Sequence, residues 1–277
     1  MSNLFNQDLL QHRIKRALPH WAQHDFLYIH TADQLRDRML DIKRDVPSVA
    51  VIGWPTPVID HALRGDKKIT NTQTLSPLET VDGILPLTPD TQDAVISHLA
   101  LHLADDPGLM LRQYYFALHP DGVMVGCLLG NDSLFELRTV LADVEQELYG
   151  GISPRIHPMM SVQDVAGLMQ QTGFALPVVD VERVTVTYGT LDKLLNDLRG
   201  TGQANILRQR RTHPVGRKFW QRVEELYRER FADERGRLIL TLDVIYMLGW
   251  APHPSQPQPK KRGSATVQLG DALAKRS

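Results

Sequence analysis

Four polar side chains form the densest group in the chain that could take part in chemistry. Asn131, Asp132, Glu136 and Arg138 follow directly after the apolar run VMVGCLL. They follow the carboxyl end of a predicted central strand, which is where open α/β sheets place their ligands. We therefore interpret this stretch as a pocket or a partner-facing surface, although Glu136 would serve equally well as a helix-capping acid.

A second polar group, Ser153, Arg155 and His157, lies in the stretch GGISPRIHP. Its glycines and prolines predict a loop, and binding residues are common in loops. The same side chains would equally well satisfy the backbone of a turn. Both interpretations stay open, and these residues join the candidate pocket or partner-facing set.

His98 and His102 have the spacing at which a helix would present two metal ligands on one face. The surrounding stretch QDAVISHLAL predicts a strand instead, which would separate them by about 13 Å. No third ligand follows nearby, and no nucleophile paired with a base can be recognised. The sequence therefore predicts no metal site and assigns no catalytic residue, while His102 stays a pocket candidate at the strand's end.

A central buried strand and the helix after it must position these groups. Pro120, Asp121 and Gly122 predict a turn, and the apolar run that follows predicts a strand buried on both faces, hence helices on both sides of a sheet. Ser133 and Glu136 match the S-x-x-E capping box that begins a helix. Open α/β sheets bind ligands where a strand's carboxyl end passes into such a turn.

Further strands are predicted along the chain. Apolar or alternating patterns occur at 48–53, 68–74, 92–101, 175–188 and 241–250. One of the last two should be antiparallel at the edge of the sheet. With the helical patterns between them, these strands predict an α/β fold with a mostly parallel sheet.

Four parts follow from this pattern. We predict N-terminal helices at 1–45, a core at 46–188 and 239–250, a helical insertion at 189–238, and a linker with a C-terminal tail at 251–277. The insertion carries the most basic patch of the chain, which consists of Arg208, Arg210, Arg211, Arg217 and Lys218. It lacks the interleaved aromatic residues of a single-strand nucleic-acid binder, so an acidic protein surface or plain solvation is the better interpretation.

The run LHPDGVMVG resembles the central part of class I S-adenosylmethionine (SAM) methyltransferases, and GNDSLFELR resembles a narrower branch of them. That branch contains the methyltransferase-like assembly factor 5 of respiratory complex I and, more distantly, the malonyl-carrier-protein methyltransferases of biotin synthesis. Other segments that resemble the assembly-factor branch are 3–17, 97–107, 150–158, 197–205, 246–250 and 262–269. Their order and number make the resemblance specific.

The resemblance implies a Rossmann-like fold with a seven-stranded sheet, helices on both faces and a helical insertion before the last strand. It also implies SAM as a cofactor, a subunit of NADH:quinone oxidoreductase as a protein partner, and a link to modification of an arginine in that subunit. On this basis Gly53, Asp82 and His102 are the candidate cofactor-binding residues.

The cofactor loop departs from the family pattern. Methyltransferases of this class have an acid, an aliphatic residue and then G-x-G-x-G, whereas this chain has VAVIGWPTP. Val51 stands in place of the acid, Gly53 is the one glycine kept, and Pro55 and Pro57 remove two backbone donors. The second strand ends in neutral groups where an acid would meet the ribose. These changes predict weak or undetectable SAM binding.

Composition limits the classes of function. A net charge of −1 over 277 residues gives no bulk attraction to nucleic acid or anionic membrane. Cys127 lies in the middle of the apolar run and is predicted to be a buried thiol, which fits a reducing cytoplasm. No apolar stretch approaches the roughly 20 residues of a spanning helix, and no signal peptide is recognised. The family match begins at Asn3, so we expect a bacterial cytoplasmic protein.

Three functions are consistent with these features. The first is a methyltransferase-like protein that assists assembly of a subunit of NADH:quinone oxidoreductase, or its modification at an arginine. The second is an active SAM-dependent methyltransferase acting on a carboxyl or other small acceptor. The third is a non-catalytic binding scaffold. We favour the first because the cofactor loop has changed while segments outside it still match.

Overall fold

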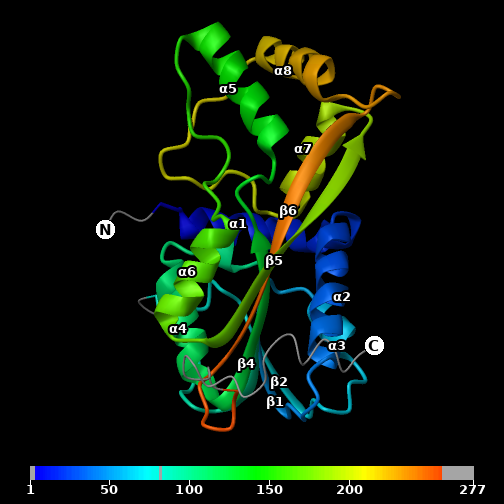
Figure 1. Ribbon diagram of the computed structural model, residues 1–277. Helices are drawn as coiled ribbons and strands as arrows, with labels where there is room; N and C mark the ends of the chain where they lie inside the picture. Colours follow the sequence, from blue (N-terminus) through cyan, green and yellow to red (C-terminus); the bar gives the residue numbers. More distant parts are fainter. Residues whose placement is uncertain (1–3, 81–82, 258–277) are drawn as a thin grey trace, which may run out of the picture.

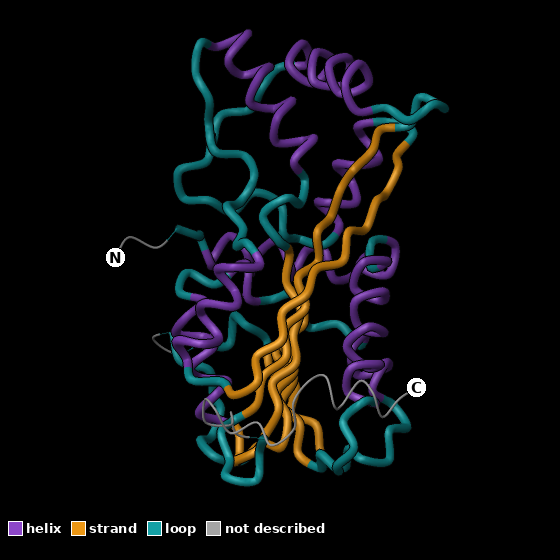
Figure 2. Tube along the Cα trace, viewed as in Figure 1, coloured by secondary structure: helices purple, strands orange, loops and turns teal. Residues whose placement is uncertain are grey.

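A computed structural model describes residues 4–80 and 83–257, and it contains one sheet with strand order β2-β1-β3-β4-β6-β5. The strands are β1 (Ser48–Ile52), β2 (Asn71–Leu75), β3 (Gln92–His98), β4 (Leu118–Leu129), β5 (Ala175–Tyr188) and β6 (Leu238–Trp250). Strands β2, β1, β3 and β4 are parallel, and β6 runs antiparallel to both β4 and β5. All of them belong to one twisted layer (Figure 2).

Helices cover both faces of this sheet, as predicted, and α1 crosses above its lower half (Figure 1). The α-helices are α1 (Gln7–Ala17), α2 (Phe26–Leu40), α3 (Val58–Leu63), α4 (Pro107–Ala117), α5 (Phe135–Tyr149), α6 (Val162–Thr172), α7 (Leu191–Gly200) and α8 (Arg217–Phe231). Alternate strand residues serve the two faces: Val51 belongs to the buried cluster that includes residues of α1, α2 and α3, whereas Ile52 belongs to the cluster that includes residues of α4 and α6. The α/β prediction is therefore confirmed.

Two details of the sheet differ from the prediction. The described residues form six strands rather than seven. The antiparallel strand is β6, which lies between β4 and β5 instead of at the edge. Strand β6 occupies this place because both of its edges find hydrogen-bond partners there, which satisfies its backbone more completely than an edge position would. The match at 262–269 lies outside the described residues.

Strands β5 and β6 continue beyond the rest of the sheet as a two-stranded ribbon. The last β4 pair is Leu129 with Val244, whereas β5 and β6 stay paired as far as Tyr188 with Leu238. Helices α5, α7 and α8 pack around this extension and share a separate buried cluster with it (Figure 1). The molecule therefore has a lower part built on the sheet and an upper part built on the ribbon.

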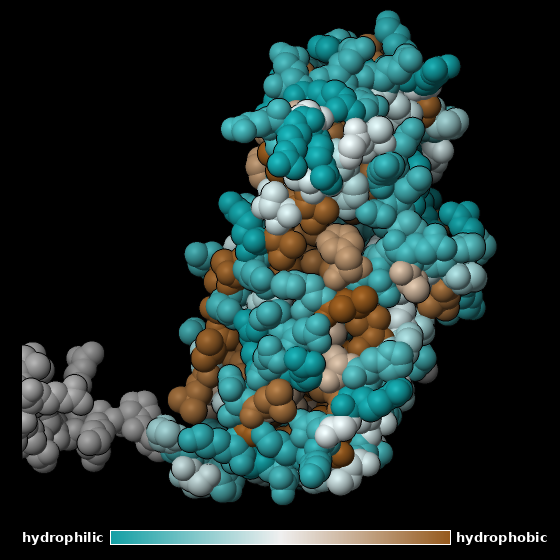
Figure 3. All heavy atoms as spheres, turned by 90° about the vertical axis from the view of Figure 1, so that its right-hand side faces the viewer, coloured by the Kyte–Doolittle hydropathy of each residue, from teal (hydrophilic) through white to brown (hydrophobic). Residues whose placement is uncertain are grey.

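The face that carries α2 shows apolar side chains gathered in patches among polar ones (Figure 3). Strand β5 is the outer strand of the described sheet on the β6 side, and its Val178 and Val181 are 57% and 49% exposed. Charged partners interrupt this edge, because Arg38 pairs with Asp180 at 2.9 Å. Charges on an edge strand discourage pairing with a second sheet.

The capping box predicted at Ser133 and Glu136 is wrong. Helix α5 begins at Phe135 after Leu134, whose φ is 61°, and no side chain caps it. The Ser133 hydroxyl instead donates to the carbonyl of Asp243 at 3.1 Å and accepts from its amide at 3.0 Å. Glu136 is buried and accepts from the amide and hydroxyl of Thr241 at 3.2 and 2.5 Å. Both side chains form hydrogen bonds with backbone groups of β6 in the stretch beyond the end of β4.

Candidate functional site

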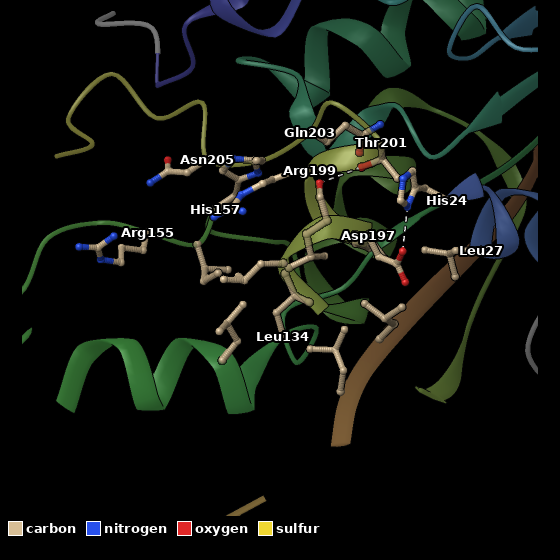
Figure 4. A pocket seen from close by; sticks show the side chains of 18 of the residues that line it. His24, Leu27, Leu134, Arg155, His157, Asp197, Arg199, Thr201, Gln203 and Asn205 are labelled. Carbon is tan, nitrogen blue, oxygen red and sulfur yellow. Dashed lines mark hydrogen bonds and ion pairs between the residues drawn. The ribbon is translucent and has the colours of Figure 1, made fainter. Parts of the chain in front are cut away.

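A pocket of about 230 Å³ lies where the two parts of the molecule meet (Figure 4). Its walls come from the start of α2, the apolar face of α5, the ribbon, α7 and the loops at 155–159 and 201–205. The walls are largely apolar, with Leu134, Leu137 and Leu141 contributed by α5. Its polar lining groups are His24, His102, Arg155, His157, Asp197, Arg199, Thr201, Gln203 and Asn205.

One end of the pocket is organised around Asp197, the only carboxylate among the described residues that line it. Its Oδ1 lies 2.8 Å from Nδ1 of His24, a residue 173 positions away in the chain (Figure 4). Tyr188 lines the same end, and burial, followed by the charge of Asp197, raises the pKa of its hydroxyl. A partly buried carboxylate is thus held beside two rings, which is a setting suited to a cation.

Gly200 makes this arrangement possible. A side chain built at Gly200 would place its Cβ 2.1 Å from Cδ2 and 2.2 Å from Cγ of His24. The imidazole therefore lies directly against the backbone at the end of α7, and only glycine leaves room for it. Two residues of the stretch DLRGTGQAN, Asp197 and Gly200, therefore contact the ring of His24 in the N-terminal part of the chain.

The buried side of the pocket carries polar atoms without partners. His102 is 5% exposed, and among the described residues its Nδ1 has no hydrogen-bond partner, nor does Nε2 of Gln203. His157 accepts from the amide of Ile206 at 3.1 Å and packs edge-on against the ring of Phe5. Burial lowers the pKa of His102 to about 3 and that of His157 to about 4, so both are neutral near pH 7.

The loop that carries Ser153, Arg155 and His157 is fixed by Glu145, which the sequence analysis missed. Glu145 accepts from the amide and hydroxyl of Ser153, each at 2.6 Å, and from Nε and Nη2 of Arg155 at 2.9 and 2.6 Å. Arg155 also lies over the ring of Phe219, 4.7 Å from its centroid. Burial raises the pKa of Glu145, but the bonds from Ser153 and Arg155 outweigh it, so the pKa is lowered.

The polar residues expected after the central strand lie outside this pocket. Asp132 is exposed and pairs with Arg183 at 3.2 Å. Arg138 donates to the carbonyls of Asn131 and Ser133, each at 2.8 Å, and lines a neighbouring hollow together with His157. Glu136 is tied to β6. The apolar face of α5 reaches the pocket, whereas its polar face stabilises the turn.

The predicted cofactor loop closes on itself. The amide of Gly53 donates to the carbonyl of Leu75 at 3.0 Å. The next residue, Trp54, is 2% exposed and its indole donates to the carbonyl of Leu99 at 2.8 Å. The indole thus lies against the end of β3, and Val51 is fully buried. Beside Trp54, a hollow of about 440 Å³ opens among the residues that follow β1, β2 and β3. The acid and two of the glycines in the class I methyltransferase pattern are replaced in this loop by Val51, Pro55 and Pro57. Asp82 lies outside the described residues.

Within residues 4–80 and 83–257, no group of three or more histidine, cysteine or acidic side chains is placed to hold a metal ion. None of the helices in this same part of the chain combines the length and hydrophobicity needed to cross a bilayer.

The fold belongs to the Rossmann-like methyltransferase class. A Bacillus halodurans protein assigned as a methyltransferase has a solved structure that matches with a TM-score of 0.51 and 13% identity, over 80% of this chain and 99% of its own. At that identity the likeness concerns the fold alone.

Sequence comparison identifies the family. No protein-family model matches the chain. The rat arginine hydroxylase NDUFAF5, mitochondrial, is 33% identical over 97% of this chain and 83% of its own length, and the human protein of that name is 32% identical with the same coverage. The chain belongs to this family. A malonyl-[acyl-carrier protein] O-methyltransferase of Laribacter hongkongensis is 33% identical over 61% of this chain and 54% of its own.

Proposed function

We propose that this chain is a cytoplasmic assembly factor for NADH:quinone oxidoreductase, which binds one subunit of that enzyme and takes part in modifying an arginine in it. Membership of the NDUFAF5 family supports the proposal, since those relatives are named as arginine hydroxylases. The observation that carries it is the convergence of separate family-like segments on one pocket.

Each of these segments supplies part of the pocket or of its support. His102 comes from 97–107, Arg155 and His157 from 150–158, and Asp197 and Gln203 from 197–205. The segment 3–17 holds the assembly together, because Nη1 of its Arg13 donates to the carbonyls of Ala204 and Asn205 at 2.6 and 2.7 Å. Phe5 of the same segment packs on His157. Segments that lie far apart in sequence but meet at one cavity support a shared function there.

The cofactor loop favours action without tightly bound SAM. We expect isothermal titration calorimetry of the purified protein with SAM to give weak or undetectable binding. Val51 replaces the acid that would contact SAM, and Pro55 and Pro57 remove two backbone donors. Each polar group of SAM left unpaired would cost on the order of 1–3 kcal/mol. Binding at low micromolar SAM would contradict this and favour the alternative function, methyl transfer to a carboxyl or other small acceptor.

Deletion of the gene in its native bacterium tests the proposed function. We expect less assembled NADH:quinone oxidoreductase and reduced NADH-driven quinone reduction in membranes, with biotin supply unaffected. Blue-native gels and membrane activity assays measure the first two, and growth without biotin measures the third. The wild-type gene on a plasmid should restore both the amount of assembled oxidoreductase and the NADH-driven quinone reduction.

A Gly53→Ala variant is the matched control for the cofactor loop. Its new Cβ would meet only Cβ and the carbonyl of His98, at 3.6 and 3.8 Å, so the fold is kept. We expect this variant to restore assembly fully. Normal enzyme content in the deletion strain would defeat the assembly function, and biotin auxotrophy would support the methyltransferase alternative. If variants that no longer recognise arginine also restored assembly of the oxidoreductase, the third function, a non-catalytic binding scaffold, would be favoured.

A further inference from the structure

We propose that Asp197 receives the guanidinium of the target arginine, with the ring of Tyr188 beside it. This inference rests on the proposed function and deepens it by assigning the residues that recognise the substrate. It applies to an arginine side chain of a polypeptide that enters the pocket between α7 and the ribbon.

The chain's own arginines show what chemistry suits such a side chain. Arg38 pairs with Asp180 at 2.9 Å while its Cζ lies 3.9 Å from the centroid of the Tyr246 ring. Arg155 pairs with Glu145 at 2.6 Å while it lies over the ring of Phe219. Each guanidinium thus has a carboxylate at its edge and an aromatic face beneath it, which are the two interactions that its planar, delocalised charge favours.

The pocket offers the same pair of groups without an arginine of the chain between them. Asp197 is the carboxylate, with its side chain 30% exposed. Tyr188, Trp220, Tyr28 and Phe26 are aromatic residues of the lining, and leucines from α5, α7 and the ribbon make up much of the remaining wall. Such walls bury the methylene groups of an arginine while its charged end meets the carboxylate. A partly desolvated ion pair of this kind is stronger than one on the open surface.

Other lining groups agree with a peptide rather than a free cation. The side chains of His102 and Gln203 line the pocket, and a peptide backbone supplies donors and acceptors that can pair with them. Arg199 also lines the pocket and would repel a cation nearby. It lies two residues from Asp197 on α7, and side chains at that spacing point to different sides of a helix. Figure 4 shows Asp197 beside His24 at one end of the pocket, with Arg155 at the other.

His24 holds Asp197 in place before the arginine arrives. Its Nδ1 occupies one carboxylate oxygen at 2.8 Å, and its ring is fixed against Gly200. The hydroxyl of Tyr188 shares a side-chain hydrogen bond with Asp197, so an arriving guanidinium would meet a carboxylate that two rings of the chain already hold.

Calorimetry, or NMR shift titration for weak binding, with N-acetyl-arginine methylamide tests the assignment. The neutral citrulline analogue has nearly the same shape and is the reference probe. We expect wild-type protein to prefer the arginine probe by about tenfold, the size expected of a charge-assisted pair. An Asp197→Asn variant keeps an acceptor for His24 but should lose this preference. The control Asp192→Asn makes the same charge change on an exposed residue of α7 and should keep it.

Two results would overturn the assignment: equal binding of both probes by wild-type protein, or an unchanged arginine preference in Asp197→Asn. Should that variant fail to fold, the preference of wild-type protein must fall between about 0.05 M and about 0.5 M salt, since screening weakens ion pairs, and an unchanged preference overturns the assignment. The deletion strain reports separately on the proposed function. Normal oxidoreductase content with an intact, Asp197-dependent arginine preference would refute the function and leave the pocket assignment standing.

Discussion

A Gly200→Ala substitution is expected to abolish complementation of the deletion strain and to lower arginine binding to the level of Asp197→Asn. The added methyl group would lie 2.1 Å from the His24 ring, so the imidazole must leave and its 2.8 Å contact with Asp197 is lost. The backbone of Gly200 does not itself require glycine, because its φ is not positive. The effect is therefore steric, with a cost of about 1–3 kcal/mol in unfolding free energy as for other overpacked sites.

The matched control is Gly167→Ala in α6, where an added Cβ meets nothing within 4 Å. That change should stabilise the protein by about 0.5–1 kcal/mol, because alanine is the better helix former. The double variant His24→Ala with Gly200→Ala removes the clash and should recover the melting temperature while arginine binding stays low. Similar behaviour of Gly200→Ala and Gly167→Ala in both assays would refute the importance of the His24 contact.

The protein is expected to lose several kcal/mol of unfolding free energy between pH 7.5 and pH 5. Burial lowers the pKa of His98 to about 4, that of His102 to about 3 and that of His157 to about 4, against about 6.5 in an unfolded chain. The unfolded state therefore binds protons first as the pH falls, and each proton favours unfolding. The stability is complete above about pH 6.5 and is lost progressively towards the folded values.

At pH 5 each such histidine costs about 2 kcal/mol, or roughly 6 kcal/mol for the three together, which is a large share of ordinary stability. Urea unfolding at pH 7.5, 6 and 5 measures the loss. A His157→Gln variant should show about two thirds of it. Glu145 gives its own acid sensitivity only below its unfolded pKa of about 4.3, so this pH window separates the two effects. Equal unfolding free energies at pH 7.5 and 5 would contradict the burial of neutral histidines.

Much of the fold could be predicted because its strands are local apolar patterns. The run around Cys127 is a strand buried on both faces, and burial raises the pKa of that thiol to about 12, as its place in the run predicts. The patterns at 175–188 and 241–250 correspond to β5 and β6. Their order in the sheet could not be predicted, because pairing partners are chosen by contacts between distant segments.

The candidate site was predictable only in part. His102, Arg155 and His157 line the pocket, and each was recognisable as a polar group in a loop or at a strand's end. Asp197 and His24 were not, because neither has a local signal and their meeting depends on a helix packing across 173 residues of chain. The capping box predicted at Ser133 and Glu136 was wrong for the opposite reason. Their spacing fits a local cap, but buried backbone groups of β6 were the stronger partners.

The inner position of β6 has a consequence for synthesis of the protein. It is the last described strand to leave the ribosome, yet it separates β4 from β5, so neither can complete its pairing until residue 250 has emerged. Until then the nascent chain presents the open edge of the apolar strand β4, which is a hazard for aggregation. The sheet edge and the upper part must therefore form late and together, as a slow, long-range step that shorter chain fragments cannot complete.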